Sequence, residues 1–206
     1  MSVLHQERQE HNMNAVQKNK VPSVDQCYTL LKKYHVPDHI IQHSEMVYKV
    51  AVFLADKLNK YGEHLLIPEI EAAALLHDIT KMGGIETHQD HAKTGKELLY
   101  KLGCKRIGKI VAEHITLQEG RNIRSLSEEE LINYSDKRVM HTKVVALAER
   151  FGDIRKRYGF KSLDKKIVDR MLILESETYE LENKIFSKLN FTPDELLPQL
   201  NAFLQR

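Results

Sequence analysis

The sequence lacks the features of several large classes of protein. It has only two cysteines, Cys27 and Cys104, which are too few for a disulfide framework, and we expect both thiols to be reduced. No apolar run is long enough to cross a bilayer, and residues 1–20 lack the apolar core of a signal peptide. These absences predict a cytoplasmic protein without a membrane partner.

The charges of the chain are nearly balanced. The 206 residues include 31 Lys and Arg against 29 Asp and Glu, which gives a formal net charge of +2. A protein whose main partner is a nucleic acid usually carries a clear basic excess. The balance therefore predicts that the chain has no dedicated nucleic-acid surface.

Composition and periodicity indicate one helical domain. Hydrophobic residues make up 42% of the chain and charged residues 29%, as in ordinary globular proteins. Residues 1–21 show no helical apolar period and no turn chemistry, so we expect a flexible or loosely docked arm. Helix signals follow one another with short gaps through residues 22–206, where we find no strand-like alternation. We therefore predict a single all-α domain of seven or eight helices, with its core at about 38–158.

Capping and helix-breaking residues give approximate helix bounds. Ser23 and Ser127 each begin a capping box, and each is expected to start a helix. Gly83 and Gly84 are expected to end the helical region that begins near residue 68. The helix after Ser127 is expected to reach Tyr158. Residues 162–206 are expected to form extra C-terminal helices, which either cover the domain or form a homodimer.

Four predicted helices place an ionisable residue on the face that should be buried. His43 lies on one stripe with Val47, and three further helices carry His77, His114 and Asp136 in equivalent positions. A lone histidine there is more often a core residue bonded to a carbonyl, and a lone aspartate can be a cap or half of an ion pair. Burying a carboxylate without compensation, however, costs several kcal/mol. Since no arginines lie on these stripes, a divalent metal is the better explanation.

Asp78 directly follows His77, and this pair constrains the geometry. Neighbouring residues of a helix point about 100° apart. Both side chains can reach one centre only if that centre lies near the end of the helix. Because a carboxylate has two oxygens, Asp78 is able to bridge two metals.

These residues match a family pattern. His43, then His77-Asp78, then Asp136 resemble the H…HD…D signature of the HD-domain superfamily. The run Ala-Ala-Ala-Leu-Leu-His-Asp-Ile-Thr-Lys at 72–81 resembles the HD helix of that family, and Tyr-Ser-Asp-Lys at 134–137 resembles its last ligand motif. The resemblance covers roughly residues 38–158. It implies an all-α HD-domain helical bundle, here with extra C-terminal helices.

Two more histidines extend the resemblance to relatives that bind two metals. The segment that begins at His91 resembles their H-x-x-x-G motif, with Gly95 in the last place, and His114 resembles their next ligand. His88 is a nearby competitor, and a partly exposed helix-start residue is the plain alternative for His91. The resemblance implies one or two divalent transition metals per chain, Fe, Mn, Ni, Co or Zn rather than Mg. The implied metal ligands are His43, His77, Asp78, His91, His114 and Asp136.

The resemblance implies a metal-dependent phosphohydrolase. A metal-activated water would hydrolyse a phosphate ester or phosphoanhydride of a small phosphorylated substrate, a nucleotide or dinucleotide. Asp78 would position the nucleophile, and Lys81 would contact the phosphate unless it is simply a solvated lysine. Lys137 and Arg138 flank the last ligand and are further candidates for substrate binding. The basic run at 155–157 is expected to be a solvated helix end.

Other functions stay open at this point. The Gly-Tyr-Pro motif of HD phosphodiesterases is absent, and Ile115 follows His114 where they have a second histidine, which argues against cleavage of cyclic dinucleotides. The same ligand set also occurs in di-iron oxygenases. A third possibility is a non-catalytic sensor or binding module with a structural metal.

Overall fold

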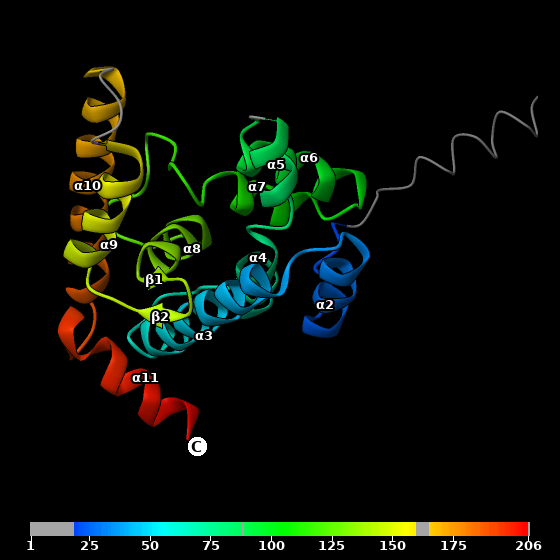
Figure 1. The fold of residues 1–206 in the computed structure, drawn as a ribbon. Helices are drawn as coiled ribbons and strands as arrows, with labels where there is room; N and C mark the ends of the chain where they lie inside the picture. The colour runs from blue at the N-terminus through cyan, green and yellow to red at the C-terminus, as the bar shows by residue number, and fades with distance from the viewer. Residues whose placement is uncertain (1–18, 88, 160–164, 206) are drawn as a thin grey trace, which may run out of the picture.

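A computed structural model describes residues 19–87, 89–159 and 165–205 (Figure 1). Across these residues the chain is almost entirely helical, and the strands present form one hairpin of two residues on each side, so the all-α prediction is confirmed. No helix of the described ranges is long and apolar enough to span a membrane. Most of the predicted N-terminal arm, the competitor His88 and the predicted helix start at residue 162 lie outside the described residues.

The order of elements differs from the prediction mainly in the number of short helices. Ten α-helices fall in the described ranges, against the seven or eight expected. The first part comprises α2 (Val24–Lys33), α3 (Asp38–Lys60), α4 (Ile67–Leu76), α5 (Lys81–Thr87), α6 (His91–Lys101), α7 (Lys105–Ala112) and α8 (Glu128–Lys137). The second part comprises β1 (Val139–Met140), β2 (Lys143–Val144), α9 (Leu147–Ile154), a π-helical turn (Arg155–Gly159), α10 (Lys165–Phe186), a 3₁₀ turn (Pro193–Glu195) and α11 (Leu196–Leu204).

Helix starts follow the capping residues of the sequence. The hydroxyls of Ser23 and Ser127 accept the backbone N–H of Gln26 and Glu130, and both capping boxes are complete. Each box satisfies two backbone donors that a helix start leaves unpaired. Gly62 follows α3 with a φ of +96°, a conformation that glycine adopts without a steric penalty.

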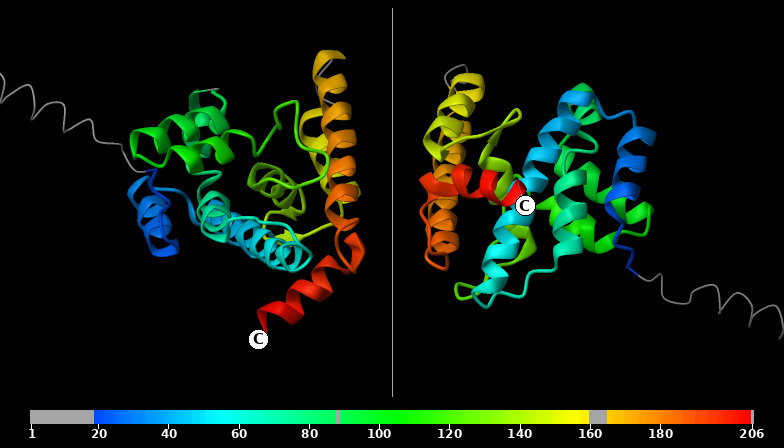
Figure 2. Two further views of the ribbon diagram at one scale, coloured as in Figure 1. Left: turned by 180° about the vertical axis from the view of Figure 1, so that it is seen from behind. Right: turned by 90° about the horizontal axis from the view of Figure 1, so that it is seen from below.

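The core lies where α3, α4, α7 and α8 meet. The long α3 runs beside α4, α2 packs on the outer side of α4, and the α6–α7 pair lies across its end (Figures 1 and 2). The helix α10 stands at the opposite edge of the molecule against α8. Phe203 of α11 returns to α3, with its ring centroid 5.4 Å from that of Phe53. The predicted C-terminal helices thus cover the bundle, which leaves the homodimer an untested prediction.

One predicted helix is broken in the structure. The helix that starts after Ser127 ends at Lys137, and the chain then makes the β1–β2 hairpin, in which Val139 pairs with Val144. His141 in the hairpin turn has a φ of +56°, outside the helical region. The prediction of one continuous helix to Tyr158 was therefore wrong. β-branched residues on both sides of a short turn stabilise the hairpin instead.

A second difference concerns the two adjacent glycines. Gly83 and Gly84 lie inside α5 rather than ending a helix. The helix α4 already ends at Leu76, and the chain turns between His77 and Thr80 before α5 begins. Glycine costs up to about 1 kcal/mol in a helix, which is too little to prevent a short helix that is held by its neighbours.

Candidate metal centre

All six predicted ligands meet in the centre of the bundle. His43 comes from the middle of α3 and Asp136 from the last turn of α8, while His77 and Asp78 directly follow α4. His91 is the first residue of α6, and His114 lies just beyond α7. Several helices thus end at or pass through one point, which satisfies the condition that the centre lies near the end of the HD helix.

The ligand atoms form two triads. His43, His77 and Asp136 make the first, and Asp78, His91 and His114 make the second; within each triad the ligand atoms lie within 4.8 Å of one another. In the first, Asp136 Oδ1 is 3.0 Å from His43 Nε2 and 3.6 Å from His77 Nε2. In the second, Asp78 Oδ1 is 3.1 Å from His91 Nε2 and 3.6 Å from His114 Nε2.

Asp78 connects the two triads. Its Oδ1 faces the second triad, while its Oδ2 is 3.3 Å from His77 Nε2 and 4.0 Å from His43 Nε2. The carboxylate is almost completely buried. The geometry therefore places one oxygen of Asp78 toward each triad, as a bridging ligand requires.

The histidine tautomers are set by backbone carbonyls. The Nδ1 atoms of His43, His77 and His114 donate to the carbonyls of His141, Ala74 and Val111 over 2.9, 2.8 and 2.7 Å. With the proton on Nδ1, each Nε2 presents a lone pair to a carboxylate that also has only lone pairs to offer. A cation between them removes this repulsion, and Nδ1 bonds of this kind orient metal-binding histidines in proteins.

Two atoms of the centre are buried without a hydrogen bond in the described part of the chain, His77 Nε2 and Asp78 Oδ1. A buried polar atom without a partner is costly, so these atoms call for a bound group. Imidazole nitrogens and carboxylate oxygens are ligands that divalent transition metals accept. The residues present therefore fit one metal in each triad.

The electrostatics of the centre show the same need for a cation. Burial alone would lower the pKa of His77, but Asp78 and Asp136 raise that pKa to about 10. Burial alone would raise the pKa of Asp136, but His43 and His77 hold it well below its usual range. Burial lowers the pKa of His114, which favours its neutral, ligating form. The carboxylates of Asp78 and Asp136 thus favour a positive charge among the histidines.

Comparison with known proteins decides the family. The family model of the HD domain matches residues 40–171, which include all six predicted ligands. The chain belongs to the HD-domain family. The predicted fold and the predicted family are confirmed, and the paired clusters of histidine and aspartate support divalent metal binding in this HD-domain protein.

The HD-domain chain also matches parts of two longer curated proteins. It is 34% identical over 144 residues to the tRNA (cytidine(56)-2'-O)-methyltransferase of Picrophilus torridus, covering 63% of this chain and 40% of that protein. It is 37% identical over 98 residues to the enzyme of the same name from Thermoplasma volcanium, covering 46% of this chain and 26% of that protein. The matches thus span less than half the length of these relatives. No solved structure matches the chain significantly.

These relatives overturn one prediction. The balanced net charge led us to expect no nucleic-acid partner, yet both relatives are named as enzymes that act on tRNA. That expectation was wrong because a net charge sums over the whole chain and says nothing about how cations are placed locally.

The three predicted substrate residues are placed differently by the structure. Lys81 begins α5, donates from Nζ to Asp78 Oδ2 over 2.6 Å, and keeps 35% of its side chain exposed, so it lies at the edge of the centre. Lys137 is buried, with its ammonium bonded to the carbonyls of His114 and Ile115 and 3.6 Å from Asp136 Oδ2. It holds the loop that carries His114.

Arg138 points away from the metal centre. Its guanidinium donates to the Tyr134 hydroxyl, to Glu182 Oε2 and to the carbonyls of Val145 and Pro193, over 2.6 to 3.0 Å. These bonds connect α8 to the hairpin and to the C-terminal segment. Arg138 thus acts as a structural residue, and it is not among the residues that we propose for substrate binding.

A cavity of about 240 Å³ opens onto the metal centre. Its walls include His43, Asp78 and Lys81, and also residues that the sequence analysis missed. The missed residues are His39, Ile40, Met82, His141 and Arg150, and the lining also includes Arg157, which the sequence analysis expected at a solvated helix end. The sequence carried no signal for Arg150, because a hairpin that it did not reveal separates α9 from Asp136.

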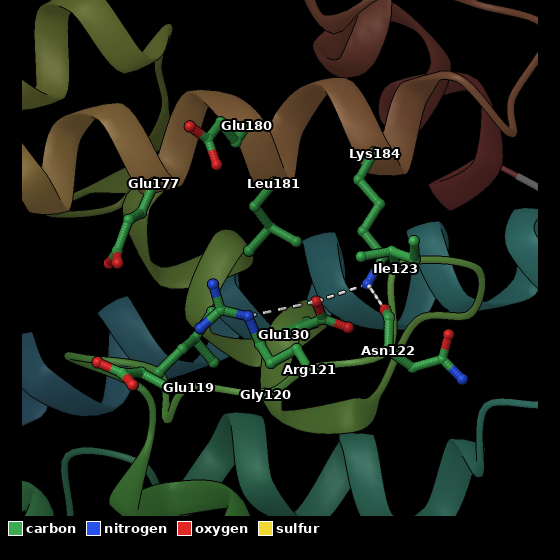
Figure 3. Close-up of a pocket in the computed structure, with 11 residues that line it drawn as sticks. Glu119, Gly120, Arg121, Asn122, Ile123, Glu130, Glu177, Glu180, Leu181 and Lys184 are labelled. Atoms are coloured by element: carbon green, nitrogen blue, oxygen red, sulfur yellow. Dashed lines mark hydrogen bonds and ion pairs between the residues drawn. The ribbon is translucent and has the colours of Figure 1, made fainter.

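A larger cavity of about 490 Å³ lies elsewhere, between the loop 117–123 and α10 (Figure 3). Its lining includes none of the six metal ligands. Arg121 and Lys184 turn toward Glu130, and Lys184 Nζ lies 2.6 Å from Glu130 Oε1 and 2.6 Å from the carbonyl of Asn122 (Figure 3). The smaller cavity is the better candidate for a substrate site, because its lining includes His43 and Asp78 of the two triads.

Proposed function

We propose that this HD-domain chain is a metal-dependent phosphohydrolase that hydrolyses a phosphate ester or phosphoanhydride of a nucleotide, either free or at the end of an RNA. The observation that carries the proposal is the placement of Asp78 between the two triads, with each of its oxygens toward one of them. The RNA form of the substrate is included because both matched relatives are named for tRNA.

The residues of the centre divide the reaction between them. Divalent metals held by His43, His77 and Asp136 and by Asp78, His91 and His114 would supply Lewis acidity and a water that is deprotonated near neutral pH. Asp78 is ionised by its surroundings, since three histidines hold its pKa well below the usual range despite burial, so it can orient the attacking water. Water adds to phosphorus, the ester P–O bond breaks, and the alcohol leaves with a proton.

Lys81 would neutralise charge on the phosphoryl group that the water attacks. Its ammonium touches Asp78 and lines the cavity, while a third of the side chain reaches solvent. A compact ammonium is a common phosphate ligand in hydrolases and transferases. This cation beside the metals also favours phosphoryl chemistry over the oxygenase that shares the ligand set.

The decisive experiment compares Asp78→Ala with the native protein. We would purify both without chelator, measure metal per chain by plasma mass spectrometry, and assay p-nitrophenyl phosphate and nucleotides with added Mn, Fe, Co, Ni or Zn. We expect about two metals per native chain. In the variant we expect turnover to fall at least about 100-fold with the helical spectrum retained, because losing a residue that merely supports a metal ligand already costs roughly 10- to 100-fold. Asp56→Ala, at an exposed ion pair on α3, is the matched control.

Full activity of Asp78→Ala would end the proposal, as would a native protein that takes up no metal. If the protein binds iron and consumes oxygen but releases no phosphate, the oxygenase would replace the phosphohydrolase as the proposed function. A tRNA that binds equally well with and without metal, and is not hydrolysed, would favour a second candidate that the names of the relatives suggest, an RNA-binding module. We do not propose methyl transfer for this chain, because more than half of each relative lies outside the match.

A further inference from the structure

Arg150 of α9 lines the cavity at the metal centre, together with Asp78 and Lys81. It lies 14 residues beyond the last metal ligand, Asp136, and on a different helix. A further chain segment thus places a cation beside the metal ligands.

The guanidinium of Arg150 is largely buried and poorly paired. Only 14% of its side chain is exposed, and its single ion pair given by the described residues is a long one, 3.7 Å from Nη1 to Asp153 Oδ2. Its Nε is buried without a hydrogen-bond partner among the residues that the structure describes. A guanidinium offers five donors in a planar fork, and burying them without acceptors is unfavourable. The geometry therefore calls for an anionic acceptor in the cavity.

The charges of the cavity indicate what kind of anion fits. Its lining holds the cations Lys81, Arg150 and Arg157 and one carboxylate, Asp78, while Asp153, outside the lining, pairs with Arg157 and more distantly with Arg150. A terminal phosphate has three non-bridging oxygens and about two negative charges, whereas a phosphodiester has two such oxygens and one charge. The fork of an arginine binds two oxygens of one phosphate. A third non-bridging oxygen is then left to face the metal ligands and Lys81, and only a terminal phosphate has one. The cavity is therefore better matched to a terminal phosphate.

We infer that Arg150 binds the non-bridging oxygens of a terminal phosphate, so that the site prefers phosphomonoesters to phosphodiesters. This inference rests on the proposed hydrolase function, which it deepens by naming the class of ester. It assigns to substrate binding a residue, Arg150, that the sequence analysis did not single out.

Kinetics on two esters test the inference. Native protein, Arg150→Gln and Arg150→Lys are assayed with p-nitrophenyl phosphate and with bis(p-nitrophenyl) phosphate. We expect Arg150→Gln to lower kcat/KM for the monoester by roughly 10- to 100-fold, mostly through KM, and to change the diester rate by less than about twofold. Arg150→Lys should recover only part of the loss, because an ammonium cannot form the paired contact. Lys156→Gln removes the same charge from an exposed neighbour outside the cavity and should behave as native protein.

A binding measurement separates this inference from the hydrolase proposal. Inorganic phosphate should raise the Tm of the native protein and protect Arg150→Gln much less, with equal metal content in both. If the native protein hydrolyses neither these esters nor the nucleotides, the hydrolase proposal fails, and the phosphate-binding role of Arg150 stands or falls on this Tm comparison alone. Equal loss on both esters, or equal phosphate protection in both proteins, would show that Arg150 is a structural residue and overturn the inference.

Discussion

The two glycines of α5 differ sharply in what an added methyl group would meet, and this provides a test of the second triad. A Cβ on Gly84 would lie 2.9 Å from the carbonyl oxygen of Gln89 and 2.9 Å from Cβ of His91. A Cβ on Gly83 would meet nothing within 4 Å. Gly84→Ala and Gly83→Ala are therefore a matched pair, in which the same atom is added to adjacent residues of one helix.

The expected displacement follows from these contacts. Ordinary carbon contacts begin near 3.4 Å, so in Gly84→Ala the start of α6, with His91, has to move by about half an ångström. Metal–ligand distances tolerate only about 0.2 Å. We expect the variant to keep the metal of His43, His77 and Asp136 and to lose most of the metal that His91 helps to hold. Overpacking should also cost about 1–3 kcal/mol, or roughly 2–12 °C in Tm for a chain of this length.

The assay is metal per chain by plasma mass spectrometry, with Tm measured on the same samples. We expect about two metals in the native protein and in Gly83→Ala, and about one in Gly84→Ala. Gly83→Ala should be as stable as native protein or slightly more stable, because alanine favours the helix. Two metals and native Tm in Gly84→Ala would refute both the packing of α5 on His91 and the role of His91 in holding the second metal.

Two further predictions concern stability away from the metals. Burial alone would raise the pKa of Glu63, but the Lys188 ammonium and the Leu126 amide lower that pKa. The ionised Glu63 therefore contributes to the free energy of unfolding above about pH 4.5, and this contribution is lost as the pH falls through the lowered pKa of the folded state. Urea unfolding of native protein and Glu63→Gln should therefore differ at pH 7 and converge in acid; a constant difference would contradict this. Arg138→Met should cost about 3–5 kcal/mol in urea by removing the cation paired with Glu182, which keeps only the hydrogen bond from the Tyr134 hydroxyl, with metal content and KM unchanged. A raised KM at native stability would instead make Arg138 a substrate ligand.

Much of the fold could be predicted from local rules. The hydroxyls of Ser23 and Ser127 cap helices where the sequence places them, because a capping box acts within four residues and needs no tertiary information. The ligands could be predicted for a different reason. An ionisable residue on an apolar face is costly unless something compensates it, so the helical period alone makes His43 and Asp136 stand out.

The roles of Arg138 and Arg150 depend on the direction in which each side chain points rather than on its position along the chain. Arg138 lies two residues after Asp136, and two steps of about 100° place the two side chains on opposite sides of α8. Its nearness in sequence to a ligand was therefore misleading, and the helical period would have corrected it. Arg150 could not be assigned in the same way, because the chain between Asp136 and α9 passes through a hairpin that the sequence did not reveal.

That hairpin, absent from the sequence prediction, orients one of the ligands that the sequence did reveal. His43 Nδ1 donates to the carbonyl of His141 in the hairpin turn. His77 and His114 use a local solution instead, since each donates from Nδ1 to the carbonyl three residues earlier, at the end of α4 or α7. The last carbonyls of a helix lack partners within the helix, so a histidine there satisfies one of them and aims its Nε2 outward. Two ligands are thus oriented by helix ends alone, whereas the third depends on a tertiary contact, and loosening the hairpin should disturb the triad of His43 before that of His114.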